Sequence, residues 1–281
     1  HVLIDFNPFY YKQAETDMKV VFDLRKSVPE NAQRYYEKAK KSRNKIPGIR
    51  KAIKDTEEKL EKLSLDEISQ PSPRKIKRRD KKWFEKYRWF KSSDGYLVIG
   101  GRDATTNDIL IKKHTDPQDI VFHANVQGAP FFVVKNQGDE AVPESTFREA
   151  AEAAASYCSA WKRGAGAADV YQVEPAQVSN TPPSGEYLPK GAFMIYGKKK
   201  WYRNVTLEVA VGYGETEPHV IGGPPSSVQE HSLAYVRVSP GDEKSGLLAK
   251  KINRFFRNKG YEDADLNDIQ YFIPAGKGRI I

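Results

Sequence analysis

The sequence predicts an α+β fold, in which an antiparallel helical coiled-coil arm is followed by a mixed α/β globular domain. Three observations predict it. In the first third of the chain, apolar residues recur at steps of three and four among Lys, Arg and Glu, which is typical of an exposed helix with one apolar seam. After Gly95, β-branched and aromatic runs alternate with turn residues, which indicates strands. Two later stretches, 145–161 in the globular domain and 245–258 in the extension that follows it, have helical spacing.

The composition favours a polyanionic partner. The 281 residues include 46 Lys and Arg against 37 Asp and Glu, giving a net charge of +9. That length suits one large domain or two smaller ones. Ribosomal RNA, transfer RNA, DNA and anionic lipid all fit the surplus of cations. The alternative is a thermostable protein that is simply rich in Lys and Glu.

Cysteine content and hydropathy restrict the cellular compartment and the cofactors that we expect. Cys158 is the only cysteine, so no disulfide forms within the chain, which fits a reducing compartment such as the cytoplasm. The sequence has no Cys/His cluster, so we expect no metal ion and no other cofactor. No apolar run reaches the ~20 residues of a membrane span, so we expect no membrane contact. The chain enters a strand directly from His1, so we expect a further N-terminal part before it.

Residues 1–26 are predicted to hold two short strands, over 2–6 and 19–24, around a turn at Asn7-Pro8. Two strands alone are only marginally stable. We therefore assign 1–26 to the last strands of a preceding domain.

The arm is expected over 27–91. Ser27 and Glu30 form a capping box that begins the first helix, and Pro47-Gly48 is expected to kink or interrupt it. After a turn rich in Ser and Pro, a second helix over 74–90 packs back antiparallel on the first. The seam pairs either within one chain or between two chains, so self-association stays open. The seam positions are Ile49, Ile53, Thr56, Leu60 and Leu63, then Ile76, Trp83, Tyr87 and Phe90.

The globular domain is expected over 92–213, followed by an α/β extension over 214–281 that packs on it. Ser145 or Thr146 is expected to cap the Ala-rich helix. Residues 214–230 are rich in Gly, Pro and Ser, so we expect a loop there. The predicted strands are 96–99, 109–111, 120–123, 131–134, 170–173, 191–196, 207–212 and 234–238, and the predicted tail is 272–274.

The strongest signal for binding lies in the second half of the arm, where cations alternate with aromatic residues. Lys and Arg neutralise phosphates, and the release of counterions makes such binding salt-dependent. The aromatic rings either stack on unpaired bases or root the arm in the globular domain, and for most of them we favour the second role. The cations assigned to RNA are Arg74, Lys75, Lys77, Arg78, Arg79, Lys81 and Lys82.

A second candidate is the strand that carries Asp119 and His123. By strand alternation the two side chains point the same way, so they suit an acid–base pair. The alternative is a hydrogen-bonded pair that shapes the strand edge, which is the more common case for a single histidine. No nucleophile accompanies them, so we expect no enzymatic activity.

Three further segments offer groups that suit a phosphate. The turn at 100–102 combines two glycines with a guanidinium, but it is not a nucleotide-binding fingerprint. Small residues at 184–185 and a lysine triplet at 198–200 flank a strand. Turns with a purely structural role are the alternative. If these segments meet, they share one RNA footprint. The residues assigned to this edge are Arg102, Asp119, His123, Ser184, Gly185, Lys198, Lys199 and Lys200.

Several motifs resemble the NFACT family of ribosome quality-control factors. Residues 29–36 are similar to the start of its coiled coil, and 83–103 resemble the start of its RNA-binding domain, NFACT-R. Residues 119–124 resemble the family's Asp-Ile-aromatic-x-His-Ala signature. The resemblance extends over 27–212, and the C-terminal tail looks like that of archaeal members. The later matching runs are 177–188 and 191–199.

The resemblance implies a function. Members of the family bind large ribosomal subunits that still carry peptidyl-tRNA after stalling, recruit tRNA, and extend the nascent chain with alanine without mRNA. It assigns 1–26 to the end of the NFACT-N domain and 92–213 to NFACT-R. The implied partners are large-subunit RNA and proteins, and tRNA. Val121 and Asn180 depart from the family pattern, in which an aromatic residue and a lysine are usual.

Two other classes stay open at this point. One is an RNA-processing enzyme centred on Asp119 and His123. The other is an extracellular adhesin, a role attached by name to some bacterial relatives.

Overall fold

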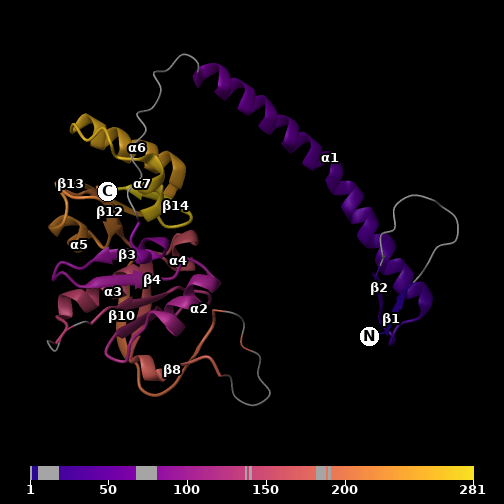
Figure 1. The fold of residues 1–281 in the computed structure, drawn as a ribbon, viewed down its shortest axis with the longest axis horizontal. Helices are drawn as coiled ribbons and strands as arrows, with labels where there is room; N and C mark the ends of the chain where they lie inside the picture. Colours follow the sequence, from indigo (N-terminus) through magenta and orange to yellow (C-terminus); the bar gives the residue numbers. More distant parts are fainter. Residues whose placement is uncertain are drawn as a thin grey trace. The chain divides into compact units, whose positions relative to one another are not determined.

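The computed structural model describes residues 2–5, 19–67, 81–136, 141–181 and 191–281, together with Gly138 and Leu188. The chain divides into two compact units, His1–Arg79 and Asp80–Ile281 (Figure 1). None of the described helices combines the length and the apolar character that a membrane span requires.

The first unit begins with the predicted pair of strands. β1 (Val2–Asp5) pairs antiparallel with β2 (Lys19–Phe22), so both strands are confirmed, while the predicted turn between them lies outside the described residues. The hydroxyl of Tyr35 accepts a hydrogen bond from the Val21 N–H at 2.9 Å and donates one to the Val21 carbonyl at 3.0 Å. These two bonds tie β2 to the following helix.

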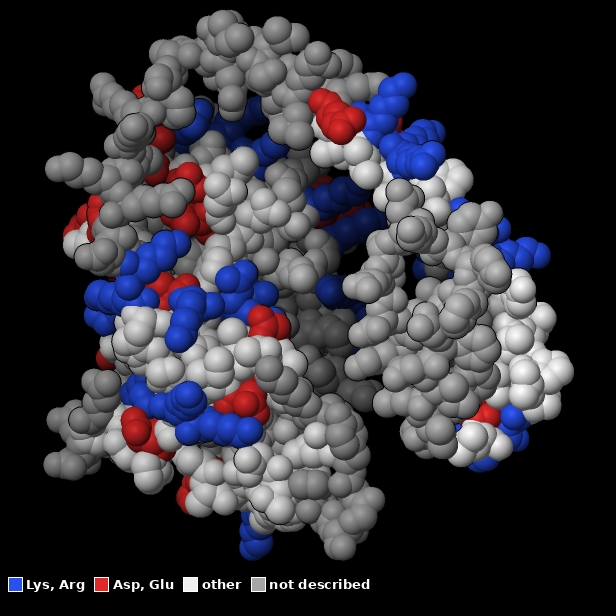
Figure 2. All heavy atoms as spheres, turned by 45° about the vertical axis from the view of Figure 1, so that its right-hand side comes forward, with Lys and Arg blue, Asp and Glu red and all other residues white. Residues whose placement is uncertain are grey.

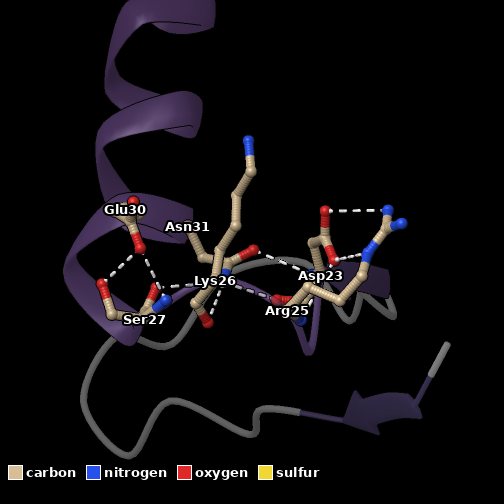
Figure 3. A network of polar contacts seen from close by, with 6 residues as sticks. All are labelled: Asp23, Arg25, Lys26, Ser27, Glu30 and Asn31. Atoms are coloured by element: carbon tan, nitrogen blue, oxygen red, sulfur yellow. Dashed lines mark hydrogen bonds and ion pairs between the residues drawn. The ribbon is translucent and has the colours of Figure 1, made fainter.

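A network of polar contacts begins α1 (Val28–Glu67), as Figure 3 shows. The Glu30 carboxylate accepts hydrogen bonds from the Ser27 N–H at 2.8 Å and the Ser27 hydroxyl at 2.7 Å, which confirms the predicted start of the helix. Asn31 is only 2% exposed. Its side-chain oxygen accepts from the Asp23 N–H at 2.9 Å, and its amide donates to the Asp23 carbonyl at 3.1 Å.

The helix α1 continues through Pro47, so it is not interrupted at Pro47-Gly48, and the alternative of a kink there stays a prediction. Proline lacks the N–H that would bond to the carbonyl of Arg43, but Arg43 is exposed and water can take that place. The seam residues Ile49 and Ile53 are 56% and 52% exposed. No described residue covers them, and 68–80 lie outside the described residues, so the coiled-coil pairing stays a prediction.

The second unit begins without the predicted helix. A short 3-10 helix, η1 (Trp83–Lys86), is followed by β3 (Arg88–Lys91), so the predicted helix over 74–90 is wrong from residue 81 onward. The aromatic residues have helical spacing, but each packs against the globular domain. The ring of Trp83 stacks on that of His114 with centroids 4.3 Å apart. Tertiary packing therefore overrides the local pattern.

A six-stranded antiparallel sheet forms the centre of this unit, in the order β10-β7-β5-β6-β4-β3. Four of its strands were predicted, whereas β3 and β10 were not. Besides β3, its strands are β4 (Leu97–Gly100), β5 (Ile120–Ala124), β6 (Phe131–Val134), β7 (Ala167–Val173) and β10 (Lys200–Thr206).

The predicted strand at 109–111 is wrong, because these residues lie in α2 (Ala104–Lys113). The carboxylate of Asp103 caps this helix by accepting a hydrogen bond from the Thr106 N–H at 2.8 Å. Leu110 of α2 packs in a hydrophobic cluster on one face of the sheet.

The other face of the sheet is covered by α3 (Glu144–Ser156), whose alanines are buried in the larger core cluster. This helix begins after Pro143, so the predicted caps are wrong. The hydroxyls of Ser145 and Thr146 instead donate to the carboxylate of Asp94, at 2.6 and 2.7 Å. The short helix α4 (Ser159–Lys162) follows α3.

The C-terminal part forms a four-stranded sheet in the order β12-β11-β13-β14. The predicted loop at 214–230 is wrong, because these residues contain a strand, β12, and a helix, α5. The predicted helix at 245–258 is confirmed as α6. The predicted boundary at 213/214 falls at the end of β11, which pairs with strands from beyond it. The elements are β11 (Val209–Tyr213), β12 (Val220–Gly223), α5 (Pro225–Glu230), β13 (Ala234–Lys244), α6 (Ser245–Asn258), α7 (Leu266–Phe272) and β14 (Lys277–Ile280).

A small two-stranded sheet lies on the connection from β7 to β10. The predicted strand at 191–196 is reduced to β9 (Met194–Ile195), which pairs with β8 (Val178–Ser179) just after the 3-10 helix η2 (Pro175–Gln177).

Candidate nucleic-acid interface

A row of rings crosses one face of the six-stranded sheet. The strand register places Trp201 opposite Tyr171, Tyr171 opposite His123, and His123 opposite Phe131. Successive ring centroids are 5.4, 5.6 and 4.4 Å apart. Trp201 on the outer strand is 36% exposed, whereas Phe131 is 3% exposed. The row therefore runs from solvent into the core.

Cations rest on the outer end of this row. The Lys199 ammonium lies 4.3 Å from the centroid of the Tyr171 ring, and the Arg203 guanidinium lies 4.1 Å from that of Trp201. Arg203 also pairs with Asp169, Nη1 to Oδ2, at 2.6 Å. Lys199 has no carboxylate partner among the described residues. We call Tyr171, Lys199, Trp201 and Arg203 the outer-strand surface.

The structure separates the three predicted lysines. Lys200, the first residue of β10, lies on the opposite face of the sheet from Lys199, because its ammonium lies over the rings of Phe147 and Tyr202 instead of Tyr171. Its ammonium lies 3.0 Å from the Glu144 carboxylate, so the structure does not bring it to the outer-strand surface. Lys198 is exposed just before β10, and its carbonyl accepts a hydrogen bond from the Gln177 amide at 2.9 Å.

His123 is bonded on both sides within the protein. Its Nε2 lies 3.1 Å from the Ala129 carbonyl, and its Nδ1 lies 3.2 Å from the Tyr171 hydroxyl. With Nε2–H as donor and Nδ1 as acceptor, both bonds are satisfied by a neutral ring. Burial lowers the pKa of His123 to about 4, which keeps the ring neutral at pH 7. The geometry therefore favours the structural role of this residue.

Asp119 is 1% exposed, so its side chain does not lie on a surface that is open to RNA. Its carboxylate accepts hydrogen bonds from the N–H groups of Asp116 at 2.7 Å and Asn136 at 2.9 Å, and it forms an ion pair with Lys135. Lys135 also pairs with Asp116, Nζ to Oδ2, at 2.8 Å. Asp119 and His123, predicted as a pair, thus bond to different partners.

Arg102 and His123 line one cleft of about 530 Å³. A Cβ atom at Gly100 would lie 2.4 Å from the Phe132 ring, and one at Gly101 would lie 1.8 Å from the Asn107 side chain. Packing therefore requires both glycines, independently of any phosphate. The cleft, called here the arginine cleft, is lined by Arg88, Arg102, His123, Tyr157, Lys162, Tyr171 and Phe193, among others.

Sequence reasoning missed several of these residues. Arg88 was placed in a helix, and Tyr157 and Lys162 were not considered, because their approach depends on contacts between distant segments. The predicted cations Lys81 and Lys82 are exposed. The remaining predicted residues, Arg74, Lys75, Lys77, Arg78, Arg79, Ser184 and Gly185, lie outside the described residues.

The exposed surface of α1 is a further basic surface, and its charge can be read directly from the sequence. Between Arg34 and Lys54 the sequence has nine Lys and Arg residues and one acid, Glu37. All nine are exposed, and Figure 2 shows several of them along the helix. They are Arg34, Lys38, Lys40, Lys41, Arg43, Lys45, Arg50, Lys51 and Lys54.

In the part of the chain that the structure describes, no three His, Cys, Asp or Glu side chains come together as metal ligands would. Cys158 is buried, and burial raises the pKa of its thiol, so it has little thiolate character.

An antiparallel sheet whose outer strand carries cations on aromatic rings is typical of domains that bind single-stranded nucleic acid. The comparisons with known proteins point to the same class. Residues 86–197 match the family model described as the NFACT protein RNA binding domain, and 7–78 match that of the NFACT N-terminal and middle domains. The chain belongs to the NFACT family.

Relatives with similar sequences are ribosome quality-control proteins. The archaeal Rqc2 homolog aRqcH of Methanocaldococcus jannaschii is 44% identical over 73% of this chain and 30% of that protein, which fits the expected archaeal type. The NEMF homolog of Drosophila melanogaster, a ribosome quality control complex subunit, is 38% identical over 75% of this chain and 22% of its own length. The chain thus spans less than a third of these relatives.

A solved structure, the C-terminal part of the fibronectin/fibrinogen-binding protein from Streptococcus suis, matches 73% of this chain and 80% of that one. Its identity is 18% and its TM-score is 0.36, which is too low to define a shared architecture.

Proposed function

We propose that this chain is the RNA-binding portion of a cytoplasmic ribosome quality-control factor. It binds stalled large ribosomal subunits and tRNA, and so supports the extension of nascent chains with alanine in the absence of mRNA. The observation that carries this proposal is the outer-strand surface, which lies partly within the segment that matches the family's RNA-binding domain.

Two physical features support RNA as the ligand. Trp201 offers an exposed ring on which a base can stack, and Lys199 and Arg203 place cations beside it for the adjoining phosphates. The face of α1 adds a dense and almost unopposed positive charge. Such charge attracts any polyanion, so it raises affinity without choosing a sequence.

Two adjacent lysines provide a matched test. Lys199→Ala and Lys200→Ala remove the same charge one residue apart, but from opposite faces of the sheet. We expect Lys199→Ala to weaken binding to tRNA and to isolated large subunits and to lower the log–log salt slope by about one. Lys200→Ala loses an exposed ion pair with Glu144 and contacts with the Phe147 and Tyr202 rings, all on the other face of the sheet, and should bind as the wild type does. Equal losses in the two variants would remove the support for this surface.

We further propose that the chain acts on RNA by binding alone. The alternative of an RNA-processing enzyme needs Asp119 as a free base or metal ligand, yet its carboxylate is engaged by Lys135 and two backbone N–H groups. We expect no cleavage of tRNA or ribosomal RNA, with or without divalent cations. Metal-dependent cleavage that disappears in a folded His123→Ala variant would overturn this proposal.

A further inference from the structure

Two arginines lie together in the arginine cleft, each on the face of a tyrosine. The Arg88 guanidinium lies 4.1 Å from the centroid of the Tyr157 ring, and that of Arg102 lies 4.3 Å from that of Tyr271. The two arginines come from β3 and from the turn between β4 and α2. The two tyrosines come from the end of α3 and from α7.

The tyrosines are held by their hydroxyl groups. The Tyr157 hydroxyl donates to the Phe272 carbonyl at 2.6 Å, and the Tyr271 hydroxyl donates to the Glu85 carbonyl at 2.8 Å. The rings therefore cannot swing away, and each presents a face to a guanidinium. Each arginine also interacts with the hydroxyl of its tyrosine. Stacking uses the flat face of the guanidinium, so the remaining N–H donors on its edge suit planar recognition of oxygen atoms.

The charge in this cleft is poorly balanced. Neither Arg88 nor Arg102 has an ion pair with a carboxylate among the described residues, and the same holds for Lys162. The one acid that lines the cleft, Asp103, is engaged in capping α2. Burial lowers the pKa of the Arg88 guanidinium, and the charge of Arg102 acts in the same direction. A half-buried cation beside a second cation is costly unless an anion neutralises both.

We infer that the Arg88–Arg102 pair is a binding site for one phosphate group of the RNA. Two fixed guanidinium forks suit the several oxygens of a phosphate, which accept paired hydrogen bonds. The site rests on the proposed RNA-binding function and adds to it a definite anchoring point. Tyr171 joins the two surfaces, because it lines the arginine cleft and also lies beneath Lys199. A strand bound on the outer-strand surface can therefore continue into the cleft.

The test compares a substitution at Arg102 that removes its positive charge with one that keeps the charge but removes the planar guanidinium. Arg102→Gln should weaken binding to single-stranded RNA by roughly tenfold at about 0.1 M salt and lower the log–log slope by about one. Arg102→Lys keeps the charge, and we expect it to restore the slope but not the affinity. Arg148→Gln, which removes an exposed cation from α3, is the matched control and should bind as the wild type does.

Arg88 supplies the second arm of the test. Arg88→Gln should weaken binding as Arg102→Gln does, but its side chain is partly buried on Tyr157, so its thermal unfolding is measured in parallel. Arg102 is exposed, and its variants should unfold at nearly the wild-type temperature. RNA with and without a 5′-phosphate distinguishes the two sources of the group. Equal affinities identify the backbone phosphodiester, and a preference that is lost in Arg102→Gln identifies the terminal phosphate.

A direct probe separates this inference from the proposed function. Inorganic phosphate is titrated into the full chain while the arginine side-chain N–H signals are followed by NMR, with Arg88→Lys and Arg102→Lys for assignment. Saturable shifts of both signals support the site, even if the wild type binds no RNA and the proposed function falls. If RNA binds but neither arginine matters and neither signal shifts, the phosphate site is wrong and the proposed function stands.

Discussion

The ring row in the six-stranded sheet combines aromatic rings with polar or charged side chains at both of its ends, but the roles of these side chains differ. Toward the inner end, both ring nitrogens of His123 are bonded within the protein. The same holds for the carboxylate of Asp119 at the other end of β5, which is buried and pairs with Lys135. At the outer end, Lys199 and Arg203 rest on ring faces beside the exposed Trp201. These buried groups hold the sheet together, whereas Lys199 and the exposed Trp201 remain available to a ligand.

The difference shows that residue type alone does not identify a binding site. A histidine and an aspartate on one strand suggest chemistry, but their bonds are already used. Lysines and a tryptophan on an outer strand suggest an ordinary basic turn, yet their geometry suits RNA. The following predictions test whether the two ends are as separate as the structure indicates.

The largest effect is expected among the buried polar groups, from Lys135→Met. This change leaves the buried Asp119 carboxylate without its cation, which should cost about 3–5 kcal/mol of unfolding free energy. RNA affinity per folded molecule should not change. The control is Lys112→Met, which breaks an exposed pair with Asp108 and should cost less than about 1 kcal/mol. Chemical denaturation measures both values, and similar costs would contradict the buried role of Lys135.

The pH dependence of stability should also report on the inner end. The pKa of His123 is about 4 in the folded protein against an ordinary 6.5, so its contribution is fully present above pH 6.5. As the pH falls from 6.5 to 4 the unfolded chain binds this proton and the folded chain does not. The resulting loss is about 3 kcal/mol, completed near pH 4.

A His123→Gln variant isolates this effect. Burial raises the pKa of Glu152 to about 7, and this carboxyl gains stability in the folded state as the pH falls, which opposes the histidine. Glu152 is present in both proteins, so its contribution cancels when the pH dependence of the unfolding free energy of His123→Gln is subtracted from that of the wild type. Parallel curves for the two proteins between pH 6.5 and 4 would mean that His123 is more accessible than the structure shows.

At the outer end the effect should fall on binding instead. Trp201→Ala removes one stacking platform and should weaken single-stranded RNA binding by about 1–3 kcal/mol. Because Trp201 is 36% exposed, the melting temperature should change little. Fluorescence anisotropy and thermal unfolding on the same sample measure both. A strongly destabilised protein with intact affinity would assign Trp201 to the inner, structural group.

The smallest effect per residue is expected on α1. Its cations are exposed, and none is held on a sheet, so Lys41→Ala should reduce affinity by less than Trp201→Ala does. The effect should vanish above about 0.5 M salt, where surface charges are screened. A salt titration of Lys41→Ala against wild type tests this.

Elements with strong local signals were predicted correctly. Ser27 and Glu30 begin α1, the basic helix at 245–258 is present, and β5 and β6 lie where β-branched runs place them. The failures have a common cause. Residues 109–111 carry a strand-like run, but the cap at Asp103 and packing make them helical.

The site was predictable only in part. Arg102 and His123 were expected to come together, and they line one cleft, although His123 is bonded within the protein. The division between Lys199 and Lys200 follows from strand alternation, but the sequence showed no strand there. The partner of Arg88 is Tyr157, which depends on how α3 packs on the sheet, and no local pattern records that.

Tyr271 has a consequence for how the protein is made. It lies far from both arginines in the sequence, yet it supports Arg102 and bonds to the backbone of Glu85. A polypeptide still emerging during translation therefore holds both arginines long before it holds the ring that positions one of them. The arginine cleft is completed only after α7 has been synthesised and docked, so a molecule that a protease cuts ahead of α7 loses the support for Arg102 as well.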